Sequence, residues 1–181
     1  MKNKTETQDP EEQYNLGLMH ANGQGAPKDA EEAVEWFRLA AEQGNIKAQY
    51  HLGGMYFKGE GVTKDNKKAV KWYRLAAEQR YADAQFILGA IYANGEGVPG
   101  DSKEAMKWYR LAAEQGQARA QFMLGVMHAN GEGVPGDYKE AVKWYRLAAE
   151  QAHSDAQLNL GVMFANGNGV PADEKAAAKW Y

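Results

Sequence analysis

The chain has 181 residues, of which 25% are charged and 11% aromatic, and it contains no cysteine. This composition is typical of a globular protein that can bury a sizeable core. The formal net charge of −3 gives no electrostatic reason to expect a nucleic-acid partner. Because cysteine is absent, disulfides, thiolate metal ligands and a cysteine nucleophile are excluded.

The first residues are polar, and we expect 1–9 to form a disordered leader that precedes one continuous domain at 10–181. This stretch has no apolar segment like that of a signal peptide, and no apolar run in the chain approaches the ~20 residues of a membrane helix. As written, the sequence predicts a cytoplasmic protein, or a periplasmic or secreted one if a signal peptide has been removed. Asp9 and Pro10 are expected to cap and begin the first helix.

From this point on, the chain repeats with a period of 36 residues. Leu-Gly pairs and paired glycines recur at this step, as do the tryptophans: Trp36, Trp72, Trp108, Trp144 and Trp180. The pattern predicts four full repeats and an incomplete fifth, at residues 11–46, 47–82, 83–118, 119–154 and 155–181. The incomplete fifth repeat leaves open a truncated array or an edge covered by another copy.

Each repeat is predicted to form two helices. The first, as in "DAQFILGAIYANG" at 83–95, carries apolar residues at helical spacing. A glycine-rich turn follows, and an aspartate in a constant position is expected to cap the second helix; these residues are Asp29, Asp65, Asp101, Asp137 and Asp173. We expect the tryptophans to lie on the buried stripe of the second helix.

Glycine is expected in a left-handed conformation just after the second helix, at Gly44 and Gly116. Arg80 and Ala152 occupy the same position in two other repeats. If these turns keep the same geometry, each should be about 1 kcal/mol less stable.

The turn of the third repeat spells G-x-G-x-x-G at Gly95, Gly97 and Gly100, the pattern of dinucleotide-binding loops. Such loops follow a strand, whereas these glycines follow a predicted helix. The third glycine is missing from three of the five repeats, and the prolines in these turns lack the N–H that a phosphate cradle uses. We interpret the glycines as turn residues and predict no cofactor.

The recurring segments L-G, N-G-x-G-V-P-x-D and A-x-K-W-Y-R-L-A-A-E-Q-G resemble the Sel1-like repeat family, a branch of the tetratricopeptide-like proteins. The resemblance covers about residues 11–181. It implies an all-α fold, a right-handed α-α superhelical solenoid of helix-turn-helix repeats whose first helices line a concave groove. It also implies a bacterial adaptor protein that binds other proteins.

The candidate binding face is the side of the first helices that varies between repeats, because residues needed for packing are expected to stay constant. It combines apolar residues with charged ones that would select acidic flanks of a peptide. We predict Lys58 to have a free charge. The predicted partner-binding residues are Lys47, His51, Lys58, Asp83, Ile87, Ala90, Arg119, Met123, Val126, Asn159 and Val162. Burial of the apolar members as additional core is the alternative.

Catalytic and metal-binding patterns are lacking in the sequence. The four histidines have no ligand spacing, and neither serine has a lysine three residues later. We therefore predict a non-catalytic scaffold that binds a protein or peptide, with no metal or nucleic-acid partner and no membrane insertion. Two alternatives remain: a β-lactam-binding or weakly β-lactam-hydrolysing enzyme, like some cysteine-rich members of the family, and a structural spacer that self-assembles through its incomplete last repeat.

Overall fold

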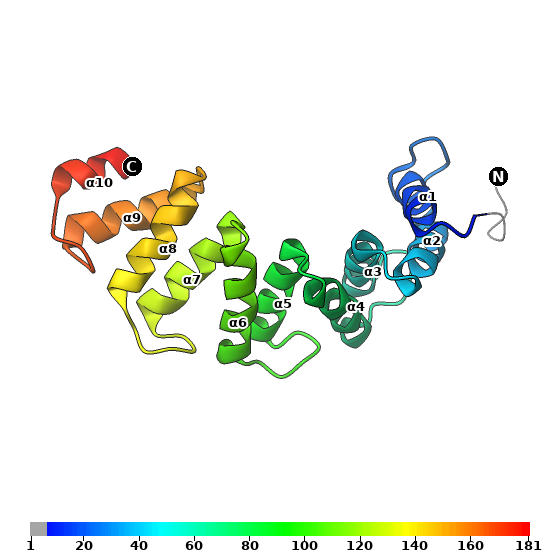
Figure 1. The fold of residues 1–181 in the computed structure, drawn as a ribbon, viewed down its shortest axis with the longest axis horizontal. Coiled ribbons are helices and arrows are strands. Elements are labelled where there is room, and N and C mark those ends of the chain that lie inside the picture. The colour runs from blue at the N-terminus through cyan, green and yellow to red at the C-terminus, as the bar shows by residue number, and fades with distance from the viewer. Residues whose placement is uncertain (1–6) are drawn as a thin grey trace. The chain divides into compact units, whose positions relative to one another are not determined.

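The computed structural model describes residues 7–181, so most of the expected leader, residues 1–6, lies outside it. The described residues form ten α-helices in chain order (Figure 1). Their bounds are α1 Pro10–Asn22, α2 Ala30–Glu42, α3 Ile46–Lys58, α4 Asn66–Glu78, α5 Ala82–Asn94, α6 Ser102–Glu114, α7 Ala118–Asn130, α8 Tyr138–Glu150, α9 Ser154–Asn166 and α10 Glu174–Trp180. The predicted all-α class, with two helices in each repeat, is confirmed. None of these helices is long and apolar enough to cross a membrane.

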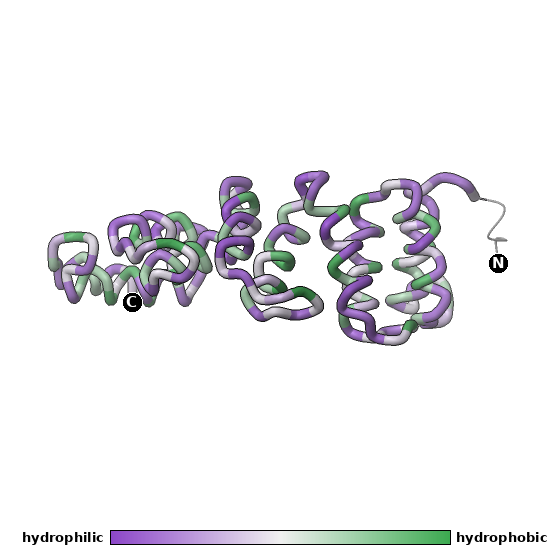
Figure 2. Tube along the Cα trace, turned by 90° about the horizontal axis from the view of Figure 1, so that it is seen from below, coloured by the Kyte–Doolittle hydropathy of each residue, from purple (hydrophilic) through white to green (hydrophobic). Residues whose placement is uncertain are grey.

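The contacts between residues divide the chain into two compact units. Unit 1 comprises the chain up to Ala84 together with 96–98, and unit 2 comprises 85–95 together with 99–181. Unit 1 contains the packed pairs α1–α2 and α3–α4, and unit 2 contains α7–α8 and α9–α10. Figure 2 shows hydrophobic and hydrophilic residues alternating along the helices of each unit, as amphipathic packing requires.

The helix ends follow the sequence signals closely. The carboxylates of Asp29, Asp65, Asp101, Asp137 and Asp173 accept a backbone N–H of the following first turn, which confirms the predicted caps. Asp9 caps α1 in the same way, ahead of Pro10. The last residues of the expected leader are held on this helix, because Thr7 donates a hydrogen bond to Glu12 and its carbonyl accepts one from Gln13.

In the first four repeats, the core contains an aromatic ring that lies on a helical glycine, whereas the ring of the fifth, Tyr181 on Gly161, is 69% exposed. In unit 2, Tyr109 of α6 is 2% exposed, and a Cβ built on Gly89 of α5 would lie 2.5 Å from its ring. Phe37 and Tyr73 cover Gly17 and Gly53 in unit 1 in the same manner. The glycine of the recurring Leu-Gly pair therefore leaves room for this ring, because it has no side chain.

This arrangement corrects the expectation for the tryptophans. Trp36 is buried, with 2% exposed. Trp72, Trp108, Trp144 and Trp180 are only half-buried. In the first four repeats the residue after the tryptophan is the aromatic side chain that packs on the helical glycine in the core.

Buried glutamines form a second recurring contact. In unit 2, the Gln121 side chain of α7 donates to the Ala113 carbonyl of α6 at 3.1 Å and accepts from Gln151 at the end of α8 at 2.7 Å. Gln49 of α3 makes the equivalent bonds to Ala41 and Gln79. One amide thus links three successive helices, and since these side chains are buried, their pairing stabilises the stacking of repeats.

From the second repeat on, the second glycine of each turn contacts the preceding repeat. Gly133 has a φ of 77°, and a Cβ built on it would lie 2.7 Å from the Ser102 carbonyl oxygen at the start of α6. Gly169 meets Tyr138 at the start of α8 in the same way. The paired glycines therefore serve the turn, as predicted, and they also let two repeats approach backbone to backbone.

Candidate functional site

The residues of the candidate face fall in both units, and each part is described by itself. In unit 1, Lys47, Lys58 and Asp83 are exposed, whereas His51 is half-buried. Lys47 lies in the first turn of α3, and its ammonium lies 5.9 Å from the centroid of the Tyr14 ring of α1. This position holds a cation above an aromatic face at the surface.

His51 belongs to an aromatic cluster in unit 1. Its ring stacks on Phe37 of α2, with centroids 5.3 Å apart and planes at 14°, and it also contacts Tyr14 at 5.7 Å. Burial lowers the pKa of His51, and the charge of Lys58 lowers it further. His51 is therefore neutral near pH 7 and packs as an aromatic residue.

The prediction that Lys58 has a free charge is wrong. Its ammonium lies 3.8 Å from the Glu60 carboxylate, and both side chains are well exposed. A pair of this length in water is weak, so Glu60 reduces the local positive charge without removing it.

In unit 2, the apolar positions differ in how far they are buried. Ile87, Ala90 and Met123 are half-buried and pack against the core cluster around Tyr109. Val126 is half-buried against the cluster around Tyr145. Only Val162 of α9 is more than one-third exposed, at 38%. These apolar residues therefore contribute to the core and also leave part of their surface exposed, so each of the two interpretations, a binding face and additional core, describes part of them.

The polar positions of unit 2 contact aromatic residues. The Arg119 guanidinium lies 4.2 Å from the centroid of the Phe86 ring, so the charge is held over the α5 surface while remaining exposed. Asn159 of α9 hydrogen-bonds the Tyr145 hydroxyl. Burial raises the pKa of Tyr145, and this hydrogen bond opposes the rise.

A bulky residue stands one position before His51 and its equivalents. Tyr14 and Phe86 are buried, and Tyr50 and Phe122 are half-buried. Leu158 of α9, the fifth member, is 53% exposed. It lies one turn before Val162 on the same helix, so these two form an exposed apolar pair.

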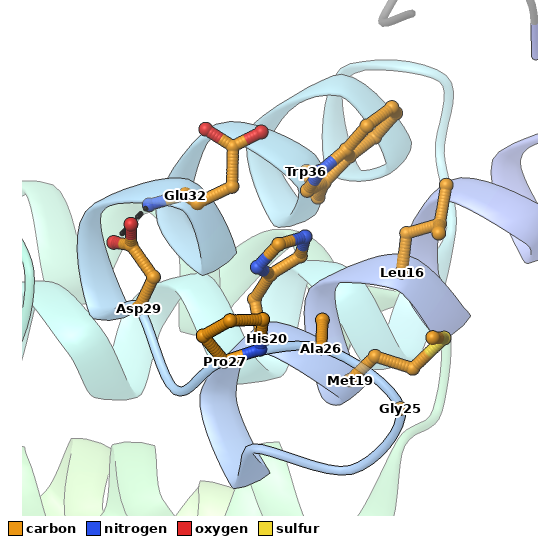
Figure 3. A pocket seen from close by; sticks show the side chains of 9 residues that line it. All are labelled: Leu16, Met19, His20, Gly25, Ala26, Pro27, Asp29, Glu32 and Trp36. Carbon is orange, nitrogen blue, oxygen red and sulfur yellow. Dashed lines mark hydrogen bonds between the residues drawn. The ribbon is translucent and has the colours of Figure 1, made fainter. Parts of the chain in front are cut away.

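A pocket of about 440 Å³ in unit 1 was not predicted from the sequence. It is lined by Leu16, Met19, His20, Gly25, Ala26, Pro27, Asp29, Glu32 and Trp36. Figure 3 shows the His20 ring extending from α1 toward Trp36 of α2, beside the Asp29 cap. The sequence signal is Ala26, which stands where the other four repeats have valine.

The equivalent positions in the fourth repeat show how the residues that line this pocket pack when another repeat precedes them. Met127, Val134 and Trp144 correspond to Met19, Ala26 and Trp36, and they pack with the core cluster that includes Met106 of α6. The pocket therefore lies on the side of a repeat that packs against a neighbouring second helix. The Trp36 and Trp144 indole N–H groups are both buried without a hydrogen-bond partner, so this feature is not peculiar to the pocket.

No group of three or more histidine, aspartate or glutamate side chains that could hold a metal ion occurs within the described part of the chain. His128 is 7% exposed and replaces the tyrosine of other repeats in the core. His153 caps α9 and stacks on Phe122 at 4.7 Å. His128 therefore serves packing, and His153 serves both packing and capping.

Comparison with known proteins gives a consistent result. The Sel1 repeat model matches residues 13–45, 46–81, 82–117, 118–153 and 154–181. A Sel1 repeat protein from Oxalobacter formigenes is 41% identical, with a TM-score of 0.91 over 99% of this chain and 71% of that one. A protective antigen of uropathogenic Escherichia coli is 42% identical, with a TM-score of 0.95. The match covers 98% of this chain and 38% of the antigen.

A more distant structure is also similar. Helicobacter pylori cysteine-rich protein B is 25% identical, with a TM-score of 0.56 over 75% of this chain and 97% of that one. No curated protein matches the sequence.

Proposed function

Because the chain belongs to the Sel1 repeat family of helical solenoids, whose members are generally scaffolds, we propose that it is a non-catalytic adaptor that binds a protein or peptide segment on its first helices. The observation that carries this proposal is the partly exposed apolar surface of α7 and α9 in unit 2. Met123 and Val126 form its half-buried part, and Leu158 and Val162 its exposed part.

Charges favour a segment with acidic flanks. Arg119 is exposed in unit 2 and is fixed over Phe86, so little side-chain entropy is lost when it meets a carboxylate. In unit 1, Lys47 has the equivalent position over Tyr14. Apolar contacts would supply affinity, and these cations would select the partner and its orientation.

The test is to select ligands from a displayed library of random peptides and to measure their affinity for variants. Leu158→Glu and Val162→Glu change exposed side chains, so the fold should survive while peptide affinity falls by roughly tenfold or more. Tyr138→Ser, which removes a 48% exposed apolar side chain at the start of the second helix α8, is the control and should bind normally.

Two results would overturn the proposal. Selected peptides that bind the two α9 variants as tightly as the wild type would remove the first-helix surface from consideration. Turnover of a chromogenic β-lactam that depends on the folded chain would contradict the non-catalytic assignment.

A further inference from the structure

A groove on the second-helix side of unit 2 lies apart from the first-helix surface. It has a volume of about 470 Å³ and runs between α8 and the turn before α10. Its lining residues are Lys139, Val142, Lys143, Arg146, Leu147, Glu150, Gly169 and Val170. The turn approaches closely here because Gly169 has no Cβ to meet the Tyr138 carbonyl.

The groove combines cations with apolar surface. Lys139, Lys143 and Arg146 are spaced four and three residues apart, so all three side chains lie on one side of α8. Val142 and Val170 contribute to its floor, and Leu147 is 44% exposed. Among residues 7–181, Lys143 pairs with Glu140 at 2.7 Å, whereas Lys139 and Arg146 have no ion-pair partner.

An equivalent groove in unit 1 has the opposite charge. It has about 320 Å³ and is lined in part by Glu31, Glu35, Arg38 and Val62, which stand 108 residues before Lys139, Lys143, Arg146 and Val170. Arg38 is neutralised there by Glu35 at 2.7 Å. The same backbone thus forms with glutamates at both lysine positions, so the lysines are not required for folding.

We propose that this α8 groove is a docking site for an acidic peptide that carries an apolar side chain. Carboxylates would pair with Lys139 and Arg146, and the apolar side chain would lie against Leu147 and Val170. Glu140 and Glu150 interrupt the positive charge on the same helix, which disfavours a uniformly charged polyanion such as nucleic acid or an anionic membrane. Separate carboxylates on a peptide can avoid these two glutamates.

The preceding second helix of unit 2 repeats the pattern. Lys103, Lys107 and Arg110 of α6 have the same spacing, and Leu111 is 44% exposed like Leu147. A longer acidic segment could therefore contact two successive helices, which would increase its apparent affinity. A decisive variant must change both helices.

The experiment uses a labelled peptide in which one leucine is flanked by aspartates, with binding followed by fluorescence anisotropy. The variant carries Lys103→Glu, Lys107→Glu, Lys139→Glu and Lys143→Glu, which install the residue type of the first repeat. We expect its affinity for the peptide to fall by roughly tenfold or more, with helicity unchanged. Leu111→Ser with Leu147→Ser should also weaken binding. The difference in affinity between parent and quadruple variant should persist when both also carry Val162→Glu, which removes binding to the first-helix surface.

Several outcomes would overturn the proposal. One is that the wild type and the quadruple variant bind the peptide with equal affinity. Another is that the wild type binds a peptide with lysines in place of the aspartates as tightly as it binds the acidic peptide. Binding of anionic vesicles or RNA homopolymer without binding of the acidic peptide would also reject it. Since the Val162→Glu variant separates the two surfaces, failure here is distinguishable from failure of the proposed first-helix site.

Discussion

Arg80 and Ala152 adopt left-handed backbone conformations, with φ of 65° and 62°. Gly44 and Gly116 occupy the same position in other repeats with φ of 89° and 86°. The Ala152 N–H donates to the Ala149 carbonyl at 2.9 Å, as the Gly116 N–H does to Ala113. The turn is therefore imposed by the packing of the helices it joins, and a residue with a Cβ is strained there.

Replacing Ala152 by glycine should stabilise the protein by about 1 kcal/mol, because the left-handed conformation then has no steric cost. Urea unfolding followed by circular dichroism measures the change. Gly116→Ala is the control, since no atom lies within 4 Å of the added Cβ, and it should destabilise by a similar amount. A neutral or destabilising Ala152→Gly would contradict the idea of strain at this turn.

The pKa of His51 predicts a pH dependence of stability. Burial lowers it below its ordinary 6.5, so the unfolded chain takes up this proton at a higher pH than the folded chain does. His51 packing therefore stabilises the fold fully above pH 6.5, and stability is lost as the pH falls from there to the lower folded pKa.

We expect His51→Phe to reduce this acid-dependent loss, because phenylalanine can stack on Phe37 without titrating. Urea midpoints measured across the pH range for wild type and variant provide the test. Some dependence should remain, since burial also lowers the pKa of His128. An unchanged pH profile in the variant would show that His51 does not titrate as the aromatic cluster requires.

At the scale of the elements, local signals predicted the helices well, and contacts between helices were harder to infer. An aspartate cap acts within its own first turn, so Asp101 and its equivalents could be identified from sequence alone. The Tyr109–Gly89 contact depends on how two helices face each other. Because tryptophan is the larger residue, the sequence favoured Trp108 as the buried aromatic side chain. The constant glycine in α5 was nevertheless a signal that a ring packs against that part of the helix.

Gly89→Ala should destabilise unit 2 by about 1–3 kcal/mol, because the new methyl overlaps the Tyr109 ring in a closely packed core. Gly54→Ala is a matched control in α3, where the nearest atom to the added Cβ is the Tyr73 hydroxyl oxygen at 3.4 Å. Helix propensity alone favours that substitution by up to about 1 kcal/mol. Equal effects of the two substitutions in urea unfolding would refute the role of the ring.

Across the whole molecule, the period of 36 residues predicted the number of repeats and the alternation of helices. It could not predict how far the candidate face is exposed, because that depends on the neighbouring repeat. Met123 is half-buried and Val162 is exposed, although both come from equally variable positions. The opposite charges of the α2 and α8 grooves were present in the sequence, but the groove itself arises only when a turn packs on the preceding second helix.

Stability in such an array is a sum of contacts between neighbours, and the turn glycines allow this to be tested. Gly133→Ala should destabilise the α6–α8 region by more than the roughly 1 kcal/mol of left-handed strain, because its Cβ also meets the Ser102 carbonyl of the preceding repeat. Gly131→Ala has a similar φ of 74° and its nearest contact lies within its own turn, at Gly136. Hydrogen exchange should therefore show faster opening at the start of α6 in the Gly133 variant but not in the Gly131 variant. Equal exchange in the two would mean that repeats are joined through their helices alone, without the backbone contact at the turn.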